Sequence, residues 1–329
     1  MNSEENIFSN LIGHQKTIQH MLDQKKSGRF PHASLFVGPK HIGKSLFTRL
    51  LAQFLQGTTQ DHSHPDITII DEVASGEDEK NHTTLSLEAR KTDSISINDT
   101  KLIQEKLQRT TNSLYNIAII NDIERMGNEA SNALLKIIEE PPSPQTLFFF
   151  TTSSLNSIPK TILSRCEVVE MHCPNWHEIE TWLKKNNFDL SPIQEILPFI
   201  PKKPGTLINM LETEEFRINL EEKISALNTN LNSKSPLSFF RYAEKIASRS
   251  DAETTLDLLT HSCQYHFNQH SNKEQVAPIL LHIQTAVKKS FKQLSQNVTP
   301  KLVMECLALE VQPLFKSLFI DHSQLAIRN

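Results

Sequence analysis

The sequence predicts an α/β fold in the first half of the chain and an all-α fold in the second half. In the first half, short β-rich runs alternate with amphipathic helical patterns, as in a parallel sheet covered on both faces. A glycine-containing turn joins the first of these runs to a helical pattern. After Met171 the strand patterns stop, and helical patterns continue to the C-terminus.

Five short apolar runs are the expected strands: Ala33–Val37, Ile67–Asp71, Asn116–Ile120, Leu147–Thr151 and Glu167–Met171. The helical patterns between them lie at Leu46–Leu55, Ile97–Thr110 and Asn128–Glu140. The stretch between Asp71 and Ser96 is polar and acidic with little periodicity, and we expect a mobile insertion or a short edge hairpin there.

The length of 329 residues is too great for one ordinary core. We expect an α/β domain at 1–172, a small helical unit at 173–213 and a helical bundle at 214–329. The longest apolar runs are strand-sized, so we expect no membrane span and a cytoplasmic protein. With 34 basic and 38 acidic residues, overall attraction to nucleic acid is not expected.

The four cysteines are Cys166, Cys173, Cys263 and Cys306. They are far apart and show no CxxC spacing, which indicates reduced thiols rather than a disulfide framework or a zinc site.

The turn after the first expected strand has the pattern of a phosphate-binding loop. It reads Gly38-Pro39-Lys40-His41-Ile42-Gly43-Lys44-Ser45. Backbone N–H groups of such a loop surround a β-phosphate, while Lys44 reaches the β- and γ-phosphate oxygens and the Ser45 hydroxyl ligates Mg²⁺. We therefore expect Gly38, Gly43, Lys44 and Ser45 to bind ATP or ADP with Mg²⁺. A chance match is the alternative, and the strand–turn–helix context argues against it. His41 is unfavourable if its φ is positive.

A buried strand that ends in polar residues lies, by expectation, one sheet position from this loop. ATPases of this kind place there an Asp that organises Mg²⁺ and a Glu that polarises water. Asn121 takes the first position and Asp122 the second, so the pattern favours nucleotide binding without efficient turnover. Two alternatives stay open. Asp122 and Glu124 cap the following helix, or a one-residue shift restores an acidic first position.

Further motifs follow in the chain. They are Pro31-His32-Ala33 before the loop, Asn132-Ala133-Leu134-Leu135-Lys136, Glu139-Glu140-Pro141-Pro142 and Ser164-Arg165-Cys166. Together they resemble the AAA+ subunits of the bacterial sliding-clamp loader of DNA polymerase III, most closely the delta-prime type. The resemblance is strong over Leu11–Glu170. It is weaker at Asn297–Glu305, which is similar to the last helix of the collar of such subunits.

The resemblance implies a P-loop AAA+ module, a helical lid at 173–213 and a helical collar domain at 214–329. It implies that Arg165 projects across a subunit boundary to the γ-phosphate held by a neighbour, which suits a planar, permanently charged guanidinium. A structural salt bridge is the alternative role for this arginine. Thr151 or Thr152 matches the position that senses the γ-phosphate, and a buried strand-end threonine is the alternative there.

The sequence also departs from that family. The four-cysteine zinc module of many relatives has no counterpart in Gln56–Asp66, where His62 and His64 alone are too few ligands, so no zinc is expected. The lid segment Lys203–Leu207 lacks the arginine of active subunits.

These departures favour a non-motor subunit that braces the ring and supplies Arg165 in trans. The implied partners are gamma/tau-type and delta-type subunits, the sliding clamp and, through the assembled complex, primed DNA. An active gamma/tau-type ATPase is the first alternative. A free-standing P-loop kinase or repair ATPase is the second, and it does not explain Ser164-Arg165-Cys166 or the helical tail.

Overall fold

A computed structural model describes residues 7–58, 64–71, 84–86, 94–109, 113–231, 233, 235, 237–246, 248–270, 273–296 and 298–319. The chain divides into two compact units. The first comprises Met1–Trp182 with Lys203–Gly205, and the second comprises Leu183–Lys202 with Thr206–Asn329. Within the described residues, no helix is both long and apolar enough to cross a bilayer.

The first unit is built on a sheet of six described strands, all parallel, in the order β3-β2-β4-β5-β1-β6. The strands are β1 (Ala33–Val37), β2 (Ile67–Asp71), β3 (Thr84–Ser86), β4 (Asn116–Ile120), β5 (Thr146–Thr152) and β6 (Glu167–Glu170). The expected parallel α/β fold is therefore confirmed. One strand, β5, separates β1, which carries the loop, from β4. Asn121 and Asp122, the two residues that follow β4, are together called the acid box.

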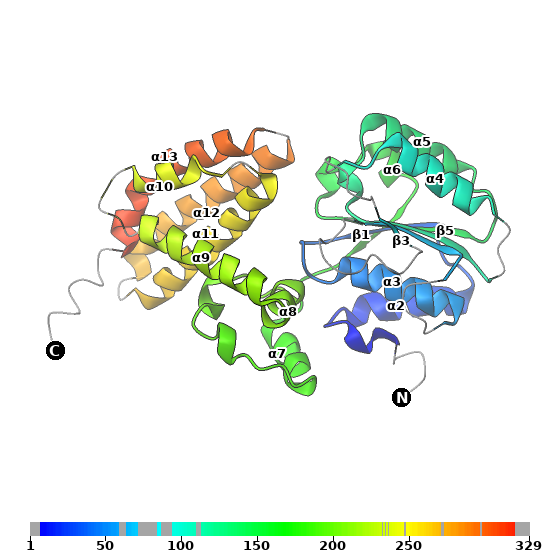
Figure 1. Ribbon diagram of the computed structural model, residues 1–329, viewed down its shortest axis with the longest axis horizontal. Coiled ribbons are helices and arrows are strands. Elements are labelled where there is room, and N and C mark those ends of the chain that lie inside the picture. Colours follow the sequence, from blue (N-terminus) through cyan, green and yellow to red (C-terminus); the bar gives the residue numbers. More distant parts are fainter. Residues whose placement is uncertain are drawn as a thin grey trace. The chain divides into compact units, whose positions relative to one another are not determined.

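Helices lie on both faces of this sheet (Figure 1). One face is covered by α2 (Gln15–Ser27) and α3 (Lys44–Gln56), and the other by α4 (Ile97–Leu107), α5 (Asn128–Glu139) and α6 (Lys160–Leu163). The shorter 3-10 helices of this unit are η1 (Phe8–Asn10), η3 (Ile123–Arg125) and η4 (Leu155–Ser157). Helix α2 was not expected from the sequence, although Ile18, Met21 and Leu22 have the helical spacing of a buried face.

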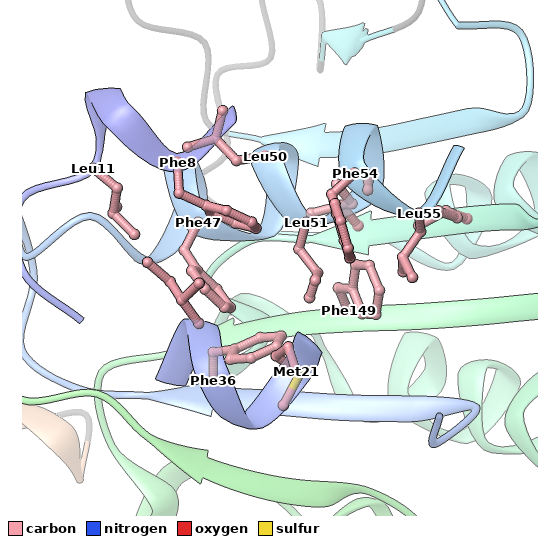
Figure 2. Close-up of a cluster of buried hydrophobic side chains, with 14 of the residues drawn as sticks. Phe8, Leu11, Met21, Phe36, Phe47, Leu50, Leu51, Phe54, Leu55 and Phe149 are labelled. Carbon is pink, nitrogen blue, oxygen red and sulfur yellow. The ribbon is translucent and has the colours of Figure 1, made fainter. Parts of the chain in front are cut away.

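Two apolar clusters sandwich the sheet because side chains alternate along each strand. On β4, Ile117 and Ile119 join the cluster under α3, while Ala118 and Ile120 join the cluster under α4 and α5. Figure 2 shows the cluster under α3, where Phe36 of β1 and Phe47 of α3 meet edge to face with ring centroids 5.1 Å apart. This packing fixes the start of α3 against the end of β1.

The edge of the sheet differs from the expectation for the polar stretch. The expected hairpin is wrong, because β3 pairs with β2 in parallel: Ile69 aligns with Thr84 and Asp71 with Ser86. A tight hairpin joins only antiparallel strands, whereas a parallel pair needs a connection of about a dozen residues, which residues 72–83 provide. Residues 72–83 and 87–93 lie outside the described part of the chain. The alternative expectation, a mobile insertion, concerns those residues and stays a prediction.

The rest of the described chain is helical, as expected. Its elements are α7 (Trp176–Lys185), η5 (Ser191–Ile193), η6 (Leu197–Phe199), α8 (Pro204–Glu212), α9 (Glu214–Leu231), α10 (Ser238–Ala243), α11 (Arg249–Gln269), α12 (Lys273–Ser295) and α13 (Pro300–Phe319). In the second unit, Phe239 of α10 and Phe315 of α13 are both buried and pack edge to face, with centroids 5.6 Å apart. The Gln312 amide donates to the Ser235 carbonyl at 3.0 Å and closes the same junction.

Candidate functional site

The loop after β1 has the backbone that its sequence requires. A Cβ on Gly38 would lie 2.2 Å from the Met171 carbonyl oxygen, so only glycine fits at this position. The Gly38 N–H donates to the Thr152 carbonyl at 3.2 Å and joins the loop to the end of β5. Gly43 has φ of 102°, and α3 begins at the next residue, so the loop ends at a helix N-terminus. This arrangement suits the binding of an anion.

The Lys44 side chain lies inside the loop. The residue is 6% exposed, and its Nζ donates to the Gly38 and Pro39 carbonyls, both at 2.8 Å. Burial lowers the pKa of Lys44 to about 8, while the negative charges of Asp122 and Glu124 raise it. Lys44 is therefore a buried cation whose charge depends on two nearby carboxylates.

Two groups from other segments of the same unit donate hydrogen bonds to backbone carbonyls of the loop. His14 Nε2 donates to the Ile42 carbonyl at 2.8 Å, and the Gly205 N–H donates to the His41 carbonyl at 2.8 Å. Burial lowers the pKa of His14, which favours the neutral ring. His41 has φ of 64°, so the unfavourable backbone noted from the sequence is present. Sequence reasoning missed His14, for which a Gly-His pair ahead of α2 is the only local signal.

The acid box lies at the end of β4. Asn121 is 3% exposed, and its N–H extends the ladder to the Ile70 carbonyl at 3.0 Å. Its Oδ1 accepts a hydrogen bond from the Thr151 hydroxyl at 3.1 Å, and that hydroxyl oxygen accepts from the Asp122 N–H at 3.0 Å. Asp122 has φ of 48° and turns the chain out of the sheet. The structure therefore brings Asn121, Asp122 and Thr151 together.

Neither carboxylate caps the following helices. Asp122 precedes η3 and makes no side-chain cap hydrogen bond, and Gly127 is the N-cap of α5. Glu124 Oε1 instead accepts from the Ser153 N–H at 2.9 Å and from the Ser153 hydroxyl at 2.6 Å. The capping interpretation is wrong, and Glu124 holds the segment that follows β5.

Of the two sensor candidates, Thr151 contacts the acid box and Thr152 does not. Thr152 is buried, its hydroxyl donates to the Ser154 carbonyl at 3.2 Å, and its own carbonyl accepts from Gly38. The contact of Thr152 with the loop is therefore made by its backbone carbonyl and not by its side chain.

Arg165 follows α6 on the surface of the first unit. Its side chain is 36% exposed, forms an ion pair with Glu139 at the end of α5 and donates to the Thr161 carbonyl at 2.8 Å. An exposed ion pair of this kind contributes little to stability, and a stronger acceptor competes with it easily. Burial raises the pKa of the adjacent Cys166 to about 12, so this thiol stays protonated at neutral pH.

The remaining candidates from the sequence are two histidines and four cysteines. His64 contacts the Ser113 hydroxyl through Nε2 at 3.2 Å, while His62 lies outside the described residues. No group of three or more candidate metal ligands occurs within the described residues. All four cysteines are free.

The chain is similar to subunits of DNA polymerase III. Residues 13–175 match the family described as DNA polymerase III, delta subunit. DNA polymerase III subunit gamma of Buchnera aphidicola subsp. Schizaphis graminum is 27% identical over 217 residues, which cover 62% of this chain and 57% of that protein. DNA polymerase III subunit tau of Bacillus subtilis is 29% identical over 164 residues, which cover 49% of this chain and 28% of that protein. The chain thus matches less than two thirds of the length of these relatives.

Among solved structures, a DNA polymerase III gamma subunit-related protein from Thermotoga maritima is 14% identical, with a TM-score of 0.45. That likeness covers 90% of this chain and 99% of the other.

Proposed function

We propose that this chain is a delta-prime-type subunit of a sliding-clamp loader, because residues 13–175 match the family described as DNA polymerase III, delta subunit, and its relatives are subunits of that polymerase. In this role it binds a nucleotide without efficient turnover, braces the ring through its helical domain and supplies Arg165 to a neighbouring ATP site. The assembly would open a sliding clamp and place it on primed DNA in the cytoplasm.

One observation carries the non-motor role. The buried residue at the end of β4 is Asn121, a neutral amide, and its carbonyl oxygen accepts a hydrogen bond from Thr151. A bound nucleotide would present its phosphates to this loop. The groups suited to hold them are the loop amides, the Lys44 ammonium and the Ser45 hydroxyl. The acid box lacks the buried carboxylate and the long Glu side chain that turnover requires.

The trans role of Arg165 is supported by its position. The side chain of Arg165 is partly exposed, and its partner Glu139 is exposed. The pair can therefore separate at small cost when a phosphate of an adjacent subunit approaches, because a bidentate contact to phosphate is the stronger interaction.

The test is a loader reconstituted from purified subunits, with clamp loading and ATP turnover measured for Arg165→Ala. We expect a loss of about 10³-fold or more in turnover at the dependent site, with assembly unchanged. Arg165→Lys should restore little, since it keeps the charge but not the planar fork. Arg109→Ala is the matched control on another exposed arginine of the same unit. Normal loading by the Arg165→Ala complex would refute the role.

A gamma/tau-type motor is the second candidate. It is favoured by the names of the curated relatives, which are gamma and tau, and these names fit it at least as well as they fit the delta-prime type. The two candidates differ in whether the isolated chain hydrolyses ATP.

A further inference from the structure

The side chain of Asn121 lies on the face of the sheet that α3 covers. Ile117 and Ile119 precede it at alternate positions of β4, and both belong to the cluster under α3. Its N–H still pairs with β2, so the strand alternation continues through Asn121. In a parallel sheet, the carboxyl ends of β1 and β4 lie at one edge, which is also where α3 begins. Asn121 therefore lies at the same edge and on the same face as the N-terminus of α3.

The two polar atoms of this side chain differ in their contacts. Oδ1 accepts the Thr151 hydroxyl, while Nδ2 is buried and has no hydrogen-bond partner among the described residues. A buried amide donor without an acceptor costs free energy, and that cost is removed when a ligand brings an acceptor to it. Phosphate oxygens are acceptors, whereas Mg²⁺ requires oxygen ligands and is repelled by an N–H dipole.

The set of groups at this edge therefore does not fit a tightly held Mg²⁺. Ser45 offers one hydroxyl, but the buried residue at the end of β4 presents an amide donor instead of a carboxylate. Glu124 Oε1 is engaged by Ser153, while its Oε2 is buried without a hydrogen-bond partner among the described residues, and the charges of Asp122 and Glu124 both act on Lys44. In this site the negative charges stabilise the lysine cation.

From these contacts we infer that the loop binds the phosphates of a nucleotide without a divalent cation, with Asn121 Nδ2 donating to a phosphate oxygen beside Lys44. The inference rests on the proposed nucleotide-binding function and deepens it: the ligand class is a free nucleoside di- or triphosphate, not its magnesium complex. Positive groups of the protein, rather than a metal ion, would balance the phosphate charge.

The experiment measures binding of a fluorescent ADP analogue to the purified full-length chain, once with Mg²⁺ and once with EDTA. We expect the same Kd in both buffers for the natural protein. Asn121→Asp should make binding depend on Mg²⁺ by about tenfold or more, since even a change next to a metal ligand alters metal affinity by about that factor. Asn128→Asp makes the same chemical change at an exposed position and should leave binding unaltered. Lys44→Ala should abolish binding in both buffers.

A Kd that weakens tenfold or more in EDTA for the natural protein would overturn the inference, and Glu124→Gln would then show whether Glu124 supplies the missing ligand. Failure to bind the ADP analogue in either buffer would also overturn it. This result does not depend on whether a variant folds, because the natural protein is the sample. Co-purification with the other loader subunits is a separate measurement, so the clamp-loader role can survive the loss of this inference.

Discussion

The hydroxyl of Thr151 joins the ends of two strands, because it donates to Asn121 Oδ1 at 3.1 Å and accepts from the Asp122 N–H at 3.0 Å. Thr151 is fully buried, so these are bonds made away from water. Both positions at which an ATPase would hold its acidic residues are thereby tied to β5. In this chain the acid box is part of the hydrogen-bonded framework of the sheet.

This link predicts a loss of stability in Thr151→Val. The substitution would leave Asn121 Oδ1 and the Asp122 N–H without this partner, which costs about 1–3 kcal/mol of unfolding free energy. Urea denaturation of the full chain measures the effect. Thr146→Val is the matched control, because Thr146 lies on the same strand, is equally buried and has a hydroxyl without a partner among the described residues. Equal losses in the two variants would show that the Thr151 link contributes nothing specific.

Turnover by the isolated chain should be near background, since Asn121 is neutral and Asp122 is one methylene shorter than Glu. The double variant Asn121→Asp with Asp122→Glu supplies both missing groups and should raise ATP hydrolysis in Mg²⁺. Release of inorganic phosphate measures both proteins, and Lys44→Ala in each background identifies turnover at this loop. Steady hydrolysis by the natural chain that Lys44→Ala removes would assign it to the gamma/tau-type motors.

The sequence predicted most of the fold because its elements have strong local signals. The strand β1 and the loop after it follow from an apolar run and the spacing of Gly38, Gly43 and Lys44. The parallel edge strand β3 was missed because three residues in a polar stretch carry no periodicity, and its pairing with β2 is a long-range choice.

Contacts at the site were harder to predict. The bonds of His14 and Gly205 to the loop join residues 28 and 164 positions from their partners, and no pattern in the sequence encodes such distances. The exposed pair of Arg165 and Glu139 is a further case, because each belongs to a recognised motif but their contact depends on how α5 and α6 pack.

Nucleotide binding should weaken as the pH rises above about 8. Burial lowers the pKa of Lys44 to about 8, so the ammonium is largely charged below this pH and loses its proton above it. Bound phosphate favours the charged form and raises the pKa, so affinity should fall by up to about tenfold per pH unit between the free and bound pKa values. Titration of a fluorescent ADP analogue from about pH 7 to about pH 9 measures this, over a range in which carboxylates stay ionised. A constant Kd would show that Lys44 does not contact the phosphates.

The helix α13 carries an apolar stripe made of Leu302, Cys306 and Leu309, spaced four and three residues apart on one helix face. Leu302 is 52% exposed and Leu309 is 60% exposed, whereas Val276, Leu280, Ile283 and Val287 of α12 are buried within the second unit. Large apolar side chains are therefore left uncovered by the second unit on α13, but not at those four positions of α12.

Under the proposed function this stripe lies against a neighbouring subunit, because large apolar side chains exposed at helical repeat are typical of interfaces. Leu302→Gln with Leu309→Gln should leave the melting temperature of the isolated chain nearly unchanged, since both side chains are already exposed, but should prevent co-purification with the other loader subunits. Leu114→Gln is the control, being a leucine of the first unit that is 65% exposed. Incorporation of the double variant at the natural level would mean that the interface lies elsewhere, and a lowered melting temperature would mean that the stripe packs within this chain.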